Sequence, residues 1–274
     1  MSVKKDASGQ RSVEAEVEVP GTPEEVWAAI ATGRGVSSWF VPTTIDGREG
    51  GAITASFGPG MDSVSKITSW SPPHRMIAES RDDMGPNDPS VATEWIVEAR
   101  SGGTCIVRVV HRWFTEKDDW DHQFEGHMHG WHAFFRILRL YLTHFRGMPS
   151  SAFQLMGFAP EPKEKAWASL SGSLGFDHAA VGQRVKTTAG TPKIAGVVER
   201  VGEAAYPEEL LLRLEEPAPG VAHLFAMAMG GQVCLSMRCF LYGERAAAVV
   251  ARDEASWQEW MNEHFPAAME SGAS

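Results

Sequence analysis

The stretch VATEWIVEARSGGTCIVRVVHRWF (residues 91–114) decides the fold. The residues on both sides of its Gly-Gly turn form two strand-like runs, and a short turn between such runs predicts an antiparallel hairpin. A second stretch, VAHLFAMAMGGQVCLSMRCFLYGE (residues 221–244), follows the same pattern with its own Gly-Gly turn. The two stretches therefore indicate an internal repeat of one structural unit.

A long amphipathic helix is predicted after the first stretch, from Asp118 to about Arg146. Its apolar side chains are three or four residues apart, so that they share one face. Gly147 and Pro149 end it. The stripe consists of Trp120, Phe124, Met128, Trp131, Phe135, Leu138, Leu142 and Phe145. A helix over residues 245–265 is expected to complete the second copy, although residues 246–251 also suit an extra strand; their alanine-rich composition favours the helix.

The residues before the first stretch complete the unit. Residues 13–19 alternate between apolar and acidic side chains, which predicts a strand. Thr22, Pro23 and two acids then begin a helix. Further strands of the first copy are expected at residues 52–57, 63–70 and 75–80. The second copy repeats this order, with a strand at 152–157, a helix that opens at 162–164, and strands at 194–201 and 209–215. We expect a flexible tail at residues 1–11, one domain at 12–149 and a second at 150–274, in an α+β class.

The composition is that of a folded globular protein, with 43% hydrophobic and 22% charged residues. The net charge of −10 argues against a nucleic-acid partner. Because no apolar run is long enough to span a bilayer and the first residues lack the apolar core of a secretion signal, we expect a cytoplasmic protein that does not bind membranes. The three cysteines lie in strand-like runs without zinc-ligand spacing, so we expect neither a metal nor a cofactor.

The order of elements resembles the START-like superfamily, also called SRPBCC. Residues 17–40, VEVPGTPEEVWAAIATGRGVSSWF, look like the opening of the branch named for the activator of the 90-kilodalton heat-shock protein ATPase. Gly102-Gly103-Thr104 and Gly130-Trp131 are similar to two further motifs of that branch. The second half matches in element order and in its Gly-Gly turn, and it lacks the Gly-Trp pair. The resemblance implies two tandem helix-grip domains, each an antiparallel curved sheet wrapped around a long C-terminal helix.

The same resemblance implies a ligand cavity between the sheet and the final helix. Core packing is the default role of each aromatic residue, and we expect about half of them to touch a ligand. The candidate lining residues are Trp39, Phe57, Trp70, Trp95, His111, Trp113, Phe124, His127, Met128, Trp131 and Phe134. The second domain is expected to be a diverged copy with a closed or remodelled pocket.

Five histidines in the long helix suggest a metal site at first sight. On a helical wheel, His122, His129, His132 and His144 lie with Glu125 opposite the apolar stripe, so we interpret them as a solvated face. His127 instead falls inside the stripe, one turn before Trp131, where an imidazole could bond a ligand or transfer a proton.

Arg108 has two possible orientations on the strand at residues 104–114. Its more apolar neighbours Cys105, Val107, Val109 and Trp113 favour an inward set that leaves Arg108 outside. A bulge would reverse the choice and turn Arg108 toward the cavity, where it could hold a carboxylate.

We expect the first domain to bind a small apolar molecule without catalysis, in a carrier, sensor or stress-related role. One alternative is a polyketide cyclase/aromatase-like or hydrolase-like enzyme with His127 or His111 as the proton-transfer group. A second alternative is a protein-interaction module of the chaperone-activator type.

Overall fold

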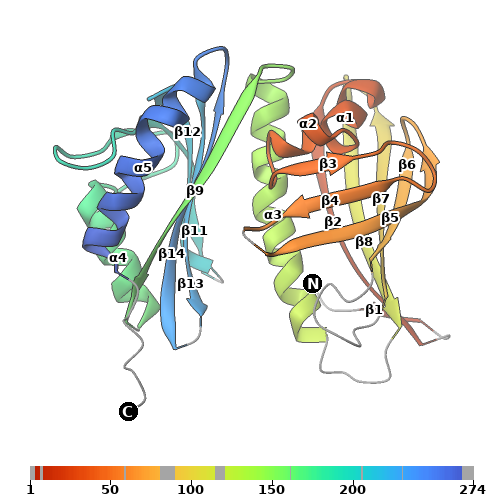
Figure 1. Cartoon of the computed structure of the whole chain (residues 1–274), viewed down its shortest axis with the longest axis horizontal. Coiled ribbons are helices and arrows are strands. Elements are labelled where there is room, and N and C mark those ends of the chain that lie inside the picture. The colour runs from red at the N-terminus through yellow and green to blue at the C-terminus, as the bar shows by residue number, and fades with distance from the viewer. Residues whose placement is uncertain are drawn as a thin grey trace. The chain divides into compact units, whose positions relative to one another are not determined.

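The computed structural model describes residues 4–6, 9–58, 60–80, 90–114, 121–160, 162–204, 206–229 and 231–266; the side chains of Phe114 and of residues 121–129 lie outside this description. The chain divides into two compact units, Met1–Gly147 and Met148–Ser274. Each unit contains one antiparallel sheet and ends in a long helix (Figure 1). The predicted α+β pair of helix-grip domains is confirmed.

The first sheet has eight strands in the order β1-β2-β8-β7-β6-β5-β4-β3. Its strands are β1 (Lys4–Lys5), β2 (Gln10–Pro20), β3 (Thr43–Ile45), β4 (Ala52–Ser56), β5 (Asp62–Ser71), β6 (Arg75–Ser80), β7 (Val91–Arg100) and β8 (Thr104–Phe114). The helices of this unit are α1 (Pro23–Ile30), α2 (Gly33–Ser37) and α3 (Asp121–His144). Thr22 caps α1 in a capping box with Glu25, which explains why the helix begins there.

The sheet grips α3 because one face of each is apolar. In register across the sheet, Ala15, Val109, Trp95 and Met76 present side chains to the same face. Along α3, which packs against β2, Phe135, Leu138, Leu142 and Phe145 are all buried. The predicted stripe is therefore confirmed over the described half of the helix.

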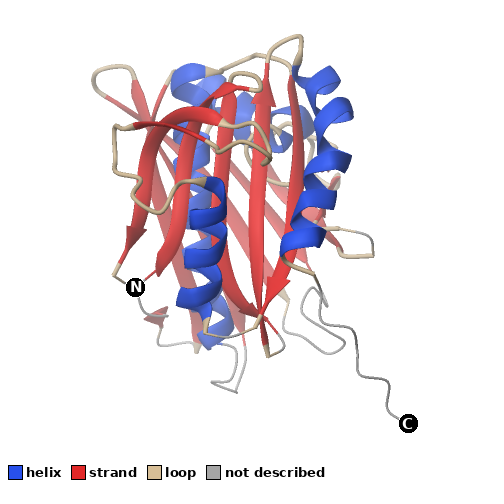
Figure 2. Ribbon diagram, turned by 90° about the vertical axis from the view of Figure 1, so that its left-hand side faces the viewer, coloured by secondary structure: helices blue, strands red, loops and turns tan. Residues whose placement is uncertain are grey.

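The second sheet has six strands in the order β10-β11-β12-β13-β14-β9. Its strands are β9 (Ser150–Ala159), β10 (Arg184–Lys186), β11 (Ala195–Glu203), β12 (Tyr206–Glu216), β13 (Gly220–Met229) and β14 (Gln232–Tyr242). Helices α4 (Lys163–Leu174) and α5 (Ala246–His264) lie against one face of this sheet (Figure 2). Leu170, Leu212, Leu235 and Met261 are fully buried in the core between them.

The structure differs from the sequence predictions in two places, and it decides a third between two alternatives. Residues 4–5 and 10–11, expected in the flexible tail, are paired strand residues, because β1 folds back onto β2. The short strands β3 and β10 were not predicted, since three residues are too few to show a period. Residues 246–251 are helical, so the preferred helix over residues 245–265 is confirmed and the alternative of an extra strand there is wrong.

Candidate functional site

Seven aromatic residues of the first unit lie in contact with one another, and we call them the aromatic cluster. They come from the residues after α2, from the residue after β4, from β7 and from α3. The aromatic cluster consists of Trp39, Phe40, Phe57, Trp95, Trp131, Phe134 and Phe135. The rings of Phe40 and Trp131 are stacked with centroids 5.1 Å apart, and Trp95 meets Trp131 edge-on at the same distance. These separations are those of favourable aromatic pairs.

The cluster runs from a sealed interior to an open end. Trp39 is completely buried, and its indole N–H donates to the carbonyl of Ala29 at 2.9 Å. Phe40, Trp131 and Phe134 are only partly buried. Phe57, in contact with Phe40 at 5.8 Å, is 51% exposed. The cluster therefore carries apolar ring surface from the core out to water.

His111 holds Trp131 in place. The indole N–H of Trp131 donates to His111 Nε2 at 2.6 Å, and His111 Nδ1 lies 2.9 Å from Thr93 Oγ1. Since an indole nitrogen can only donate, Nε2 must accept, and the neutral imidazole then carries its proton on Nδ1 and donates to Thr93. The rings of His111 and Trp131 also stack at 5.8 Å. His111 thus orients Trp131.

The other predicted lining residues are not among these seven. Trp70 packs edge-on against Trp27 of α1, with centroids 5.1 Å apart. Trp113 is 1% exposed and stands opposite Arg11 of β2 in the sheet register. The side chains of Phe124, His127 and Met128 lie outside the described residues, so the structure leaves their predicted role untested.

Arg108 points away from the gripped face. Its guanidinium forms ion pairs with Glu16 of β2 at 3.1 Å and with Glu98 of β7 at 3.5 Å. The hydrogen bond to Glu16 raises the pKa of Arg108 further above its ordinary value. The preferred outward placement is confirmed, and the bulge that would have turned Arg108 inward is absent from the β2–β8 and β7–β8 registers.

Two of the helix histidines can be placed. His144 is exposed, whereas His132 is partly buried, and its burial together with Arg136 lowers its pKa. Among the described residues, no three His, Cys, Asp or Glu side chains are placed to hold a metal ion, and no helix has the length and apolarity needed to cross a membrane.

Sequence reasoning missed several residues of this region. Phe40, Phe135 and Thr93 were not candidates, although Phe135 was in the helix stripe and Phe40 adjoins Trp39. Buried Arg11 was assigned to the tail. The alternation of Val13 and Ala15, continued back by two residues, predicts an inward position for Arg11.

A comparison with models of protein families finds a match within the first unit. Residues 20–143 match the family described as "Activator of Hsp90 ATPase homolog 1-like protein". The family resemblance inferred from the Gly-Gly-Thr and Gly-Trp motifs is confirmed over these residues. No curated protein matches the chain.

Several solved structures are similar to it at low identity. The di-domain ARO/CYC BexL from the BE-7585A biosynthetic pathway is 12% identical, covering 94% of this chain and 100% of its own, with a TM-score of 0.45. DynU16, a putative protein in the dynemicin biosynthetic locus, is 16% identical. The match covers 91% of this chain and 93% of DynU16, with a TM-score of 0.42. Protein MLL2253 from Mesorhizobium loti is 19% identical. The match covers 48% of this chain and 97% of MLL2253, with a TM-score of 0.44.

Proposed function

We propose that the first unit binds a small apolar molecule with a flat ring system at the open end of the aromatic cluster. The observation that carries this proposal is the half-exposed ring of Phe57, which continues the stacked rings of Phe40 and Trp131 into water. An apolar patch that is continuous with the core and lies open is a usual feature of a binding site.

The expected affinity comes from surface removed from water. Each 100 Å² of apolar surface covered by a ligand contributes roughly 2.5 kcal/mol before the cost of immobilising the ligand. Flat rings suit this site because aromatic neighbours add about 0.5–1.5 kcal/mol per pair at centroid distances of 4.5–7 Å. The hydrogen bond from Trp131 to His111 fixes one wall of the site before a ligand binds. This preorganisation lowers the entropic cost of binding.

The cyclase-like and hydrolase-like alternative finds less support in the described residues. His111 Nε2 already accepts from Trp131, so it is not available as a general base in this arrangement. Arg108 is engaged by Glu16 and Glu98 on the opposite face. The side chain of His127, the other candidate proton-transfer group, lies outside the described residues. On the described residues we propose binding without catalysis, in a carrier or sensor role.

Thermal unfolding of the full chain with a library of polycyclic apolar compounds tests the proposal. A compound that binds only the folded state raises the melting temperature. We expect the rise to shrink in Phe57→Ala and to persist in Val64→Ala. Val64 is a matched control, because it is 56% exposed on β5 and is offset by an odd number of residues from buried Ile67, which places it on the other face. The proposal is wrong if Phe57→Ala and Val64→Ala retain the same response.

A further inference from the structure

Thr93 is the polar residue at which the hydrogen bonds behind Trp131 reach the gripped face of the first sheet. The side chains of Thr93, Trp95 and His111 share that face, because Trp95 is two residues further along β7 and His111 stands opposite Thr93 in the register. Trp95 is buried, whereas Thr93 is only partly buried. Thr93 therefore places a hydroxyl group beside the rings of the aromatic cluster.

The direction of each hydrogen bond in this chain is fixed by the chemistry of the groups. The indole N–H of Trp131 can only donate, so His111 Nε2 accepts it at 2.6 Å. The neutral imidazole then carries its proton on Nδ1 and donates to Thr93 Oγ1 at 2.9 Å. Within the described part of the chain, Thr93 Oγ1 makes no other hydrogen bond. The hydroxyl proton of Thr93 is therefore directed to a group from outside the chain.

Two serines extend the polar surface next to Thr93. Ser80 of β6 follows Ala78, the residue opposite Thr93, by two positions, and Ser65 of β5 stands opposite Ser80. Their side chains therefore share the face of Thr93. Among the described residues, neither serine hydroxyl has a hydrogen-bond partner. In the sheet order, β5 and β6 lie between β4, which Phe57 follows, and β7. The hydroxyl groups thus line the path from Phe57 to Thr93.

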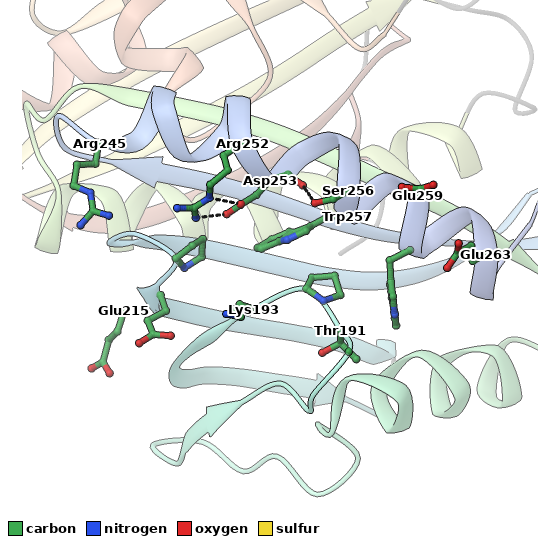
Figure 3. Close-up of a pocket in the computed structure, with 15 residues that line it drawn as sticks. Thr191, Lys193, Glu215, Arg245, Arg252, Asp253, Ser256, Trp257, Glu259 and Glu263 are labelled. Atoms are coloured by element: carbon green, nitrogen blue, oxygen red, sulfur yellow. Dashed lines mark hydrogen bonds and ion pairs between the residues drawn. The ribbon is translucent and has the colours of Figure 1, made fainter.

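The hydroxyl groups beside the second unit's largest hollow are engaged differently. This hollow of about 900 Å³ lies between α5 and residues 190–193 and 215–217 (Figure 3). Its two hydroxyl side chains already donate to backbone carbonyls, Thr191 to Thr188 at 2.7 Å and Ser256 to Asp253 at 3.0 Å. Their protons are therefore not directed to a ligand, in contrast to that of Thr93.

The hydroxyl group of Thr93 selects among flat apolar ligands. A ligand that lies against Trp131 and covers Thr93 takes the place of water at this hydroxyl. The ligand must then supply an acceptor, because a donor that is covered and left without a partner costs more free energy than a hydrogen bond gains. A carbonyl oxygen suits the position, since it accepts hydrogen bonds and brings no charge that would have to leave water.

The distance between the two ends of the site sets the size of the ligand. Three strand spacings separate β4 from β7, which amounts to about 14 Å along the sheet. A molecule that contacts Phe57 at one end and Thr93 at the other therefore has several fused rings.

We propose that Thr93 determines the specificity of the first unit, by donating a hydrogen bond to a carbonyl oxygen at one end of a flat polycyclic ligand. This inference rests on the binding function proposed above, and it adds the polar group of the ligand and the residue that recognises it. Ser65 and Ser80 contact the edge of the same ligand.

A pair of ligands and one variant test this role. The probes are 2-acetylphenanthrene and 2-ethylphenanthrene, which share one ring system and differ by the carbonyl oxygen. Equilibrium dialysis with the full chain gives a dissociation constant for each, and the ratio of the two constants is the preference for the ketone. We expect this preference to be about three to ten times larger in the unmodified protein than in Thr93→Val, which removes the hydroxyl group and keeps a branched side chain.

Two control variants separate recognition from a general loss of structure. Thr93→Ser keeps the hydroxyl group and should keep the preference for the ketone. Thr54→Val makes the same exchange as Thr93→Val on β4, at a position opposite Val64 on the other face of the sheet. This variant should have the preference of the unmodified protein.

The outcomes distinguish this inference from the proposed function. An equal preference in the unmodified protein and in Thr93→Val, or its loss in Thr93→Ser as well, would overturn the role of Thr93. If both compounds nevertheless bind, and bind less tightly to Phe57→Ala, the proposed binding function stands without that role. Binding of neither compound to the unmodified protein would overturn both.

Discussion

Trp131 and His111 form the residue-scale feature on which the first-unit site depends. Because indole only donates, the 2.6 Å contact fixes the imidazole as the Nδ1–H tautomer. Long-range nitrogen–proton correlation spectra of the protein at neutral pH should show that tautomer for His111. Observation of the Nε2–H tautomer would contradict the arrangement.

Replacing Trp131 by Phe tests the same contact energetically. The variant keeps an apolar ring and removes the donor to His111, so we expect unfolding to become easier by about 1 kcal/mol. The loss should be reduced when Trp131→Phe is combined with His111→Phe, because the unsatisfied acceptor is then removed as well. Denaturant titration of the single and double variants measures both effects, and additive losses would show that the contact contributes nothing.

Glu94 is a second residue with a measurable signature. It is 4% exposed on β7, and it lies 2.5 Å from Arg75 Nε and within hydrogen-bond contact of Arg112. Burial alone raises the pKa of Glu94, but the two arginines outweigh that effect and hold the pKa below its ordinary value. The ionised form is therefore favoured by folding.

The lowered pKa of Glu94 makes the free energy of unfolding depend on pH. A lowered pKa in the folded state gives stability that is complete above the unfolded pKa of about 4.5 and is lost as the pH falls through the folded value. We expect Glu94→Gln to lose about 2 kcal/mol at pH 7 and to approach the unmodified protein below pH 4. Denaturant titrations across pH 3–7 measure this difference. A difference that does not change with pH would contradict the account.

At the scale of elements, α5 protects the outer edge of β9. The side-chain amide of Gln258 donates to the carbonyl of Met156 at 2.8 Å and accepts from its N–H at 3.2 Å, as a neighbouring strand would. The N–H of Phe158 likewise donates to the carbonyl of Phe265 at 2.8 Å. Edge strands with open backbone groups pair readily with other chains, so this cover has a clear physical role.

Gln258→Ala removes that cover. We expect a loss of about 1–2 kcal/mol for the two hydrogen bonds and an increase in self-association at high protein concentration. Denaturant titration and size-exclusion chromatography report the two effects. The exposed helix residue Glu254, replaced by Ala, serves as the control, and equal behaviour of both variants would show that the amide does not protect the strand.

Elements with a long apolar period were predictable from the sequence, and short or locally determined ones were not. The strand at residues 104–114 and the later half of α3 follow directly from spacings of two and of three to four residues. Strands β3 and β10 have only three residues each, and β1 exists because it pairs with β2. No local pattern encodes such pairing.

The residues of the candidate site were likewise predictable from the sequence only in part. Trp39, Trp95, Trp131 and Phe134 could be chosen because aromatic residues on inward positions of gripping elements meet in the core. The separation of Trp70 from them, and the contact between His111 and Trp131, depend on distances across the sheet that no linear spacing reports.

At the scale of the whole molecule, the two copies of the fold have diverged in chemistry. The first unit presents an aromatic cluster that ends in half-exposed Phe57, and the second presents charged side chains around two buried tryptophans. Two copies of one fold with different side chains at their surfaces need not share a function, because function depends on the site and not on the fold. The central claim is the proposal that the aromatic cluster of the first unit binds a ligand.

Native mass spectrometry of the full chain tests that claim most directly. The protein is mixed with the apolar compound that gives the largest rise in melting temperature, and Phe57→Ala and Val64→Ala are measured in parallel. We predict one bound molecule per chain for the unmodified protein and for Val64→Ala, with clearly reduced occupancy for Phe57→Ala. The absence of any adduct, or equal occupancy in all three proteins, would contradict the account.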